Sequence, residues 1–447
     1  MKNKLLVFIL LLCSFSYSQE KSEIDELREE IKQLKEKIDS NSTSIEHIQN
    51  NPIATEEIKS PARIKFSGGG LLRFGEWDVN QQRMNPKTGL HYNDGDRFWS
   101  RFNFYLGTDI KLTKDVDFHA RIRTGNKQYS FVSFGGNDDE RLNVLLDEFW
   151  LNYSYKFTDI RIGRQSASRI WNNQSGVMFD IPTHDGATII SDFKLGNDLN
   201  LRSKAAYFVE RYANNAPLKD QGKMYGFSLE LSSRIANAIP WKISSGIIKA
   251  EALPTRYRND LAQTSDGITR YNDGDLAPDY SIWASQFSIE LKQFYGLSLI
   301  VDYYNNLRKY NENPISHMIY DINGNNSYSN RNEYDSSKSV DFTKQTQGFV
   351  ATIAVGDQAI AKQIYAGISY LYMEKYAAMD YFAQYDFSRW TSSNIKGPEF
   401  SLAYKLNKYL KLRSRLFIAE EIKGLNAIDT DFKRSGTRLR IDMNINF

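Results

Sequence analysis

The strongest constraint in this sequence is a regular alternation of apolar and polar residues. Between Phe98 and Leu112, phenylalanine, leucine and isoleucine occupy most of the even positions, whereas Arg101, Asn103 and Asp109 stand among the odd ones. Successive side chains of a β-strand point to opposite faces, so this pattern predicts strands with one apolar face and one polar face. A chain built from such strands must place the apolar face against a core or against lipid.

The alternation recurs in sixteen segments. Every second connection between them is long, which gives eight long connections and seven short ones. Outer-membrane barrels have tight periplasmic turns and long external loops, and an even strand number places both ends on one side. We therefore predict an all-β, up-and-down, antiparallel transmembrane β-barrel of 16 strands, or 18 if residues 381–390 supply another pair. The predicted strands are approximately 64–77, 97–112, 116–125, 144–157, 159–165, 186–194, 199–211, 222–233, 240–251, 281–292, 297–307, 344–355, 362–374, 396–406, 409–420 and 434–447.

The N-terminus predicts export. Lys2 and Lys4 precede the apolar run 5–12, and small residues lead to a cleavage site near Gln19, so residues 1–18 are expected to be a cleaved signal peptide. No later segment has 18 consecutive apolar residues, which argues against a transmembrane helix. Cys13 is the only cysteine, so the mature chain is expected to have no disulfide and no thiolate metal site.

Residues 19–50 are predicted to form a periplasmic coiled coil, joined by a linker at 51–63 to the barrel at 64–447. Apolar residues recur at the a and d positions of four heptads, and the flanking charges suit a parallel assembly. We expect self-association rather than a lone amphipathic helix, although the heptads leave dimer and trimer open. The contact residues would be Ile24, Leu27, Ile31, Leu34, Ile38, Ile45 and Ile48.

Four stretches of the predicted barrel look familiar: RTGN (123–126), LDEFWLNYSY (146–155), IRIGRQ (160–165) and FDIPTHDGATI (179–189). They resemble the porin families of Gram-negative outer membranes that carry an N-terminal coiled coil, and they have some similarity to alginate-export-type barrels. The chain also ends on an amphipathic strand with a terminal Phe447, which resembles the recognition signal of outer-membrane barrels. The resemblance implies a channel integral to the outer-membrane lipid, water-filled or conducting polyanions, and an oligomer, for which we favour a trimer.

If the apolar face contacts lipid, the other face lines a wet lumen and carries many basic residues. Such charges can balance acidic neighbours within the wall, or they can favour the passage of anions. The sequence supports the two alternatives equally. Barrel closure would bring the last strand beside the first, so basic residues from both ends of the chain could form one stripe. The basic lumen set is Arg101, His119, Arg121, Arg123, Arg202, Lys204, Lys242, Arg413, Arg415, Arg438 and Arg440.

The third long loop, residues 166–185, is a candidate constriction, because one external loop of porins often folds inward. An ordinary surface loop is the alternative. The residues concerned are Arg169, Trp171, Asp180, His184 and Asp185.

Enzymatic chemistry finds little support. The five histidines form no H-E-x-x-H pair, no G-x-S-x-G is present, and we expect no metal and no cofactor. Asp147 and Glu148 are adjacent, so in a regular strand they should point to opposite faces and not act as a pair. The run SGGG (67–70) predicts close packing or curvature in a strand. The net charge of +3 gives no argument for nucleic acid.

These observations predict an outer-membrane channel, not an enzyme, for the passive diffusion of small hydrophilic solutes, with a preference for anions. A conduit dedicated to an acidic polysaccharide or oligosaccharide is the alternative. An adhesin is a third hypothesis, because residues 252–280 and 308–343 form long polar loops.

Overall fold

The computed structural model describes Lys32 and residues 63–78, 81–84, 91–94, 97–125, 132–133, 144–179, 183–196, 198–210, 222–235, 238–252, 279–310, 342–379, 393–423, 433 and 435–447. The chain divides into two units between Pro61 and Ala62, and all of these residues except Lys32 belong to the second unit. The predicted signal peptide, the heptad residues of the coiled coil, the linker up to residue 62 and the possible strand pair at 381–390 lie outside the described residues.

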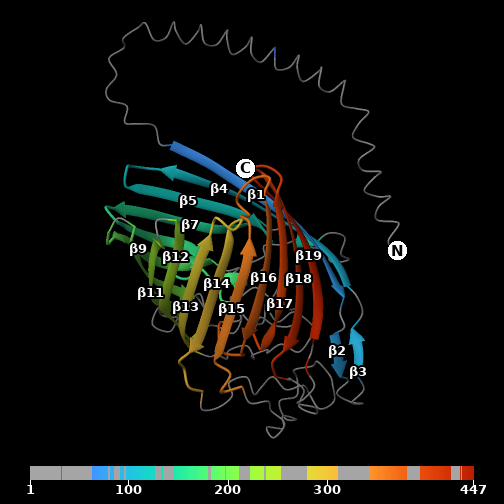
Figure 1. Cartoon of the computed structure of the whole chain (residues 1–447). Coiled ribbons are helices and arrows are strands. Elements are labelled where there is room, and N and C mark those ends of the chain that lie inside the picture. Colours follow the sequence, from blue (N-terminus) through green and yellow to red (C-terminus); the bar gives the residue numbers. More distant parts are fainter. Residues whose placement is uncertain are drawn as a thin grey trace, which may run out of the picture. The chain divides into compact units, whose positions relative to one another are not determined.

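Sixteen long strands form one closed antiparallel sheet (Figure 1). Each long strand pairs with its neighbours along the chain, and β1 pairs with both β4 and β19, which closes the barrel. The predicted fold and the number of 16 strands are confirmed, and every strand boundary lies within three residues of its predicted position. The long strands are β1 (Arg63–Asp78), β4 (Arg97–Lys111), β5 (Val116–Thr124), β7 (Val144–Tyr155), β8 (Thr158–Ser166), β9 (Thr183–Lys194), β10 (Asn200–Glu210), β11 (Gly222–Ile235), β12 (Ile239–Glu251), β13 (Tyr280–Leu291), β14 (Leu297–Asn306), β15 (Gln347–Val355), β16 (Ile364–Met373), β17 (Ile395–Lys405), β18 (Leu410–Glu421) and β19 (Ser435–Asn446).

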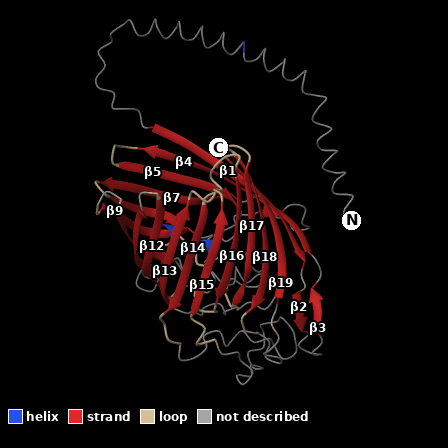
Figure 2. Ribbon diagram, viewed as in Figure 1, coloured by secondary structure: helices blue, strands red, loops and turns tan. Residues whose placement is uncertain are grey.

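Short elements accompany the barrel. A two-residue strand, β6 (Val132–Ser133), pairs with β4, and β2 (Gln81–Met84) forms a separate hairpin with β3 (His91–Asp94). Figure 2 shows how strongly strands dominate, since the helical turns among the described barrel residues are η1 (Ala167–Arg169) and η2 (Gln174–Gly176). In the part of the chain that the structure describes, no helix is long and apolar enough to cross a membrane.

The two faces of the strands differ as the alternation predicts. In β19, Ile441 and Ile445 are exposed, whereas Arg438, Arg440 and Asp442 are each 3% exposed. Since most of the large apolar side chains that are exposed stand on the outward face of the strands, this face is the lipid-contacting surface of the barrel, and the other face surrounds the lumen.

The lumen face is apolar where loops cover it. Phe208, Met224, Ile248 and Ile282 point inward from β10 to β13 and belong to one buried hydrophobic cluster. The cluster is completed by side chains of the segments that follow β8 and β16. These residues lie on the face predicted to line the lumen, but the expectation that this face is wet was wrong in this sector, because inward-folded segments shield these side chains from water.

The glycine run in β1 serves barrel closure, which confirms the predicted close packing. Gly68 and Phe447 exchange two backbone hydrogen bonds of 2.9 and 3.0 Å. A Cβ atom on Gly68 would lie 2.4 Å from the Phe447 ring, and one on Gly69 would lie 2.5 Å from the carbonyl oxygen of Ile445. The missing side chains let the C-terminal residues lie flat on the first strand.

Candidate functional site

A β-bulge places two adjacent acidic residues in the lumen. Arg121 of β5 stands opposite Glu148 of β7, but Ile122 stands opposite Leu146, so Asp147 is an extra residue in β7. Arg121 contacts both carboxylates, at 2.7 Å from Glu148. The prediction that Asp147 and Glu148 point to opposite faces was wrong, because it assumed a regular strand.

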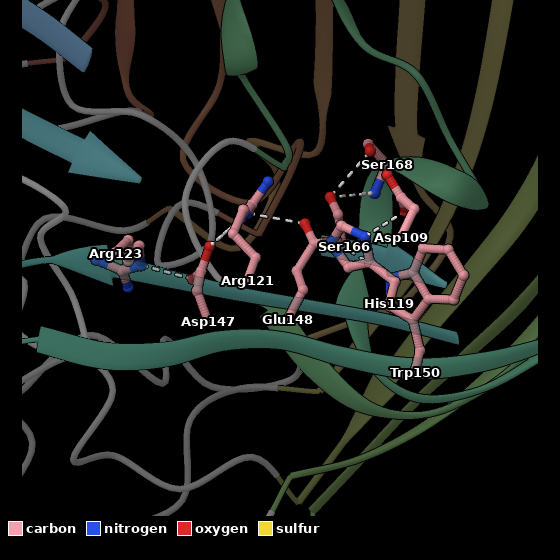
Figure 3. Close-up of polar contacts among 9 residues, drawn as sticks. All are labelled: Asp109, His119, Arg121, Arg123, Asp147, Glu148, Trp150, Ser166 and Ser168. Carbon is pink, nitrogen blue, oxygen red and sulfur yellow. Dashed lines mark hydrogen bonds and ion pairs between the residues drawn. The ribbon is translucent and has the colours of Figure 1, made fainter. Parts of the chain in front are cut away.

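Arg123 contacts Asp147 as well, since its Nε lies 2.5 Å from Oδ1 of this carboxylate (Figure 3). His119, nearby on β5, contacts Asp109 at 2.7 Å through Nδ1 and lies 3.6 Å from Glu148 through Nε2. Its ring stacks on Trp150 with a centroid separation of 4.7 Å. The basic residues of this sector therefore alternate with acids that neutralise them.

The indole of Trp150 also contacts a cation. The guanidinium carbon of Arg161 on β8 lies 3.3 Å from the ring centroid. Ser166 and Ser168, also drawn in Figure 3, bond to each other through their hydroxyls at 2.9 Å where β8 ends.

The wall from β9 to β12 is balanced in the same way. Arg202 stands directly opposite Asp192, with 2.5 Å between Nε and Oδ1. Glu230 lies 3.2 Å from Lys204 and 3.9 Å from Lys242. Opposite charges on neighbouring strands stabilise a sheet, so a structural role in the barrel wall accounts for these residues.

The neighbouring strands β18, β19, β1 and β4 carry a row of inward arginines that we call the arginine wall. Its members stand at positions that alternate with the exposed apolar residues. It consists of Arg73, Arg101, Arg413, Arg415, Arg438 and Arg440.

Like charges face each other across strands in this wall. Arg415 stands directly opposite Arg440, and Arg73 stands directly opposite Arg101. Direct pairs of equal charge destabilise a sheet, which sets this wall apart from the balanced sectors. The sequence-based set missed Arg73, which joins the arginines of β4 to those of β19.

Asp442 and Glu399 are carboxylates of the described strands that contact the arginine wall. Asp442 lies 2.8 Å from Nε of Arg73 and 2.9 Å from Arg440. Glu399 of β17 accepts hydrogen bonds of 2.5 and 2.8 Å from Arg415, and its Oε1 lies 3.8 Å from Arg413. Glu399 was also missed by sequence reasoning, although it occupies an inward position of a predicted strand.

Residues 167–179, which we call the inward loop, cross the lumen face of the barrel from β8 to β17. Ser228 of β11 donates to the carbonyl of Ile170 at 2.8 Å, and Gln286 of β13 donates to the carbonyl of Asn172 at 3.0 Å. Trp171 and Met178 are buried in the hydrophobic cluster.

Asp302 of β14 holds the tip of the inward loop. It accepts hydrogen bonds from the backbone N–H of Gln174 and from Nε2 of Gln286, both at 2.8 Å. Tyr304 donates to the same carboxylate at 3.0 Å. Beyond this point, Ser175 donates to Glu399 at 3.3 Å, so the tip reaches the arginine wall.

The predicted loop residues lie in different places. Arg169 donates to Thr188 at 3.0 Å, and burial lowers the pKa of its guanidinium, an effect that Arg202 strengthens and Asp159 opposes. His184 is buried in β9. Asp185 also belongs to β9 and pairs with Arg164 at 2.8 Å. Asp180 lies outside the described residues. The predicted loop therefore extended too far, because β9 begins at Thr183.

The described part of the barrel offers no candidate metal site. Within the described ranges, no three His, Cys, Asp or Glu side chains are grouped so that they could hold an ion.

Comparison with known proteins decides the family. The family model described as "Putative porin" matches residues 186–447, which is more than half of the chain. The chain belongs to the putative porin family. The predicted resemblance to porins is thereby confirmed, and family and fold together identify a porin-type channel of the outer membrane. No curated protein matches the sequence.

Solved structures are similar to this porin at low sequence identity. OprB of Pseudomonas putida is 11% identical, with a TM-score of 0.50, over 86% of this chain and 94% of that chain. DcaP of Acinetobacter baumannii is 10% identical, with a TM-score of 0.43, over 88% of this chain and 100% of that one. The trimer form of OmpT of Vibrio cholerae is 10% identical, with a TM-score of 0.44, over 86% and 99% of the two chains.

Proposed function

We propose that this porin is a passive-diffusion channel for small hydrophilic solutes with a preference for anions. The observation that carries the preference is that arginines stand directly opposite each other on neighbouring strands, Arg415 opposite Arg440 and Arg73 opposite Arg101. These pairings set positive charge directly beside positive charge, whereas Arg202 of β10 stands between Asp192 of β9 and Glu230 of β11. Rings of positive charge lower the barrier for anions in a pore.

The inward loop supplies the constriction in this proposal. It is fixed to β11, β13 and β14 by hydrogen bonds, and its apolar side chains pack against the wall instead of facing water. A loop held in this way narrows the lumen next to Asp302. The tip of the loop then lies beside Glu399 and the arginine wall.

Planar-bilayer recording tests the proposal. The full-length protein, purified from outer membranes, should give discrete conductance steps, and under a potassium chloride gradient its reversal potential should favour chloride several-fold. Absence of steps would refute the channel, whereas steps with a potential that favours potassium would refute only the anion preference.

An acidic oligosaccharide remains the second candidate solute, because the arginine wall extends over four neighbouring strands and could contact several carboxylates at once. The same recordings separate the two candidates. An oligouronate that blocks chloride current at far lower concentration than a single uronate favours the dedicated conduit. Equal block per carboxylate favours general diffusion of small anions.

We further propose that the porin is a homo-oligomer, with a trimer favoured, assembled through the heptad residues from Ile24 to Ile48. Sedimentation of the detergent-solubilised protein measures the number of chains. Replacing Ile31 and Leu34 by aspartate should lower it, because both occupy apolar positions of the heptads. A monomer in the unmodified protein would contradict the proposal.

A further inference from the structure

Glu399 connects the arginine wall with the tip of the inward loop. Its two oxygens face Arg415 in a bidentate arrangement, at 2.5 Å from Nε and 2.8 Å from the terminal nitrogen. The oxygen at 2.8 Å also accepts the hydroxyl of Ser175 at 3.3 Å. The side chain is only 2% exposed, so one carboxylate serves both partners in a water-poor setting.

The surroundings of Glu399 suit an oxyanion. Arg413 lies 3.8 Å from its Oε1, and Arg440 stands opposite Arg415 on the next strand. The guanidinium carbons of Arg415 and Arg440 lie 4.6 and 5.8 Å from the ring centroid of Phe417, which orients both of them. A planar guanidinium binds carboxylate or phosphate groups of any origin with the same fork geometry that Glu399 uses here.

The loop tip itself is strained. Ser175 has φ 49° and ψ 16°, a left-handed conformation that is unfavourable for residues other than glycine. Hydrogen bonds from its neighbour Gln174 to Asp302 and to the carbonyl of Val350 hold one side of the tip. The contact with Glu399 holds the other side, so its loss gives Ser175 a way to relax.

We propose that Arg413 and Arg415 form a binding site for the carboxylate or phosphate group of a permeating solute, and that solute binding there loosens the tip of the inward loop. The solute exchanges with Glu399, which withdraws from Arg415 and no longer accepts the Ser175 hydroxyl. The contacts of Gln174 remain, so the tip loosens without releasing the whole loop. The inference rests on the proposed anion channel and adds a site and a coupled motion to it.

Coupling of this kind works in both directions. A solute that weakens the contact between Ser175 and Glu399 must bind more tightly when that contact has been removed in advance. Both sides of the linkage can therefore be measured, one at the loop and one at the anion site.

The loop is probed by thiol labelling of the exported channel, because Cys13, the only native cysteine, lies in the predicted signal peptide. We expect N-ethylmaleimide, a neutral reagent, to label Val177→Cys about tenfold faster in phosphate than in chloride of equal ionic strength, the effect of losing one hydrogen bond to a charged group. Val177 is only 4% exposed at the loop tip, and its replacement keeps the Ser175 hydroxyl in place. Asn172→Cys, in the same loop but away from Glu399, serves as control and should change less than about twofold.

The anion site is probed by the phosphate concentration that halves chloride current through the full-length channel. Glu399→Gln should lower that concentration about tenfold and Ser175→Ala a few-fold, since each removes part of the competing contact. Glu251→Gln, on the outward face of β12, should leave it unchanged. If Glu399→Gln fails to fold, Ser175→Ala still decides. Unchanged phosphate block together with unchanged labelling overturns this inference while conductance steps persist, whereas loss of the steps in the unmodified protein overturns the proposed channel instead.

Discussion

The double substitution Arg101→Gln and Arg440→Gln should remove most of the preference of the channel for chloride over potassium. Each change takes one member from a direct arginine–arginine pair of the arginine wall. A unit charge about 4 Å from a passing ion contributes about 1 kcal/mol even at the dielectric constant of water. Loss of two such charges should therefore lower the permeability ratio several-fold, which the reversal potential in a potassium chloride gradient measures directly.

The fold should survive this double substitution. Equal charges opposite each other destabilise a sheet, so their removal relieves repulsion between neighbouring strands. Asp442 loses its contact with Arg440 but keeps the 2.8 Å contact with Arg73. The barrel should therefore retain the heat-dependent mobility on electrophoresis that reports a folded β-barrel.

A charge-matched control is available on the outward face. Arg164 pairs there with Asp185 at 2.8 Å, and Lys223 pairs with Glu251 at 3.2 Å. Arg164→Gln with Lys223→Gln changes the net charge equally but leaves the lumen untouched. If both double variants give the same permeability ratio, the arginine wall does not select ions.

The barrel could be predicted well from the sequence because the same pattern recurs in every strand. Each of the sixteen strands carries its own alternation, and the sorted connections add an independent constraint on where each strand ends. One misplaced boundary, such as the start of β9 at Thr183 instead of Gly186, does not disturb the rest. Agreement among many weak local patterns is what allows a barrel to be predicted at all.

The lumen was less predictable for physical reasons that concern particular residues. Asp147 turns inward because of a bulge, and an extra residue in a strand leaves no mark in the alternation until its partner strand is known. Ile248 and Ile282 are apolar residues of the lumen face because the inward loop covers them there, a tertiary contact between distant segments. The opposition of Arg73 and Arg101 depends on strand register, which the sequence of one strand does not specify.

Asp302→Ala should produce the largest change in conductance, because it removes the acceptor that holds the tip of the inward loop. The carboxylate is fully buried and accepts hydrogen bonds from the backbone of Gln174 and from the side chains of Gln286 and Tyr304. A buried donor left without an acceptor costs about 1–3 kcal/mol, so three of them disfavour the observed loop position strongly. The tip should leave the wall, and we expect single-channel conductance to rise about twofold with greater current noise.

Tyr304→Phe is the matched control for this prediction, since it removes one donor from the same carboxylate and leaves Asp302 in contact with Gln174 and Gln286. Its conductance should stay close to that of the unmodified channel, which separates release of the loop from a general disturbance of the hydrophobic cluster. The prediction concerns folded barrels only, so both variants are recorded after their electrophoretic mobility has been checked. A folded Asp302→Ala channel with unchanged conductance would mean that the inward loop does not limit the flow of ions.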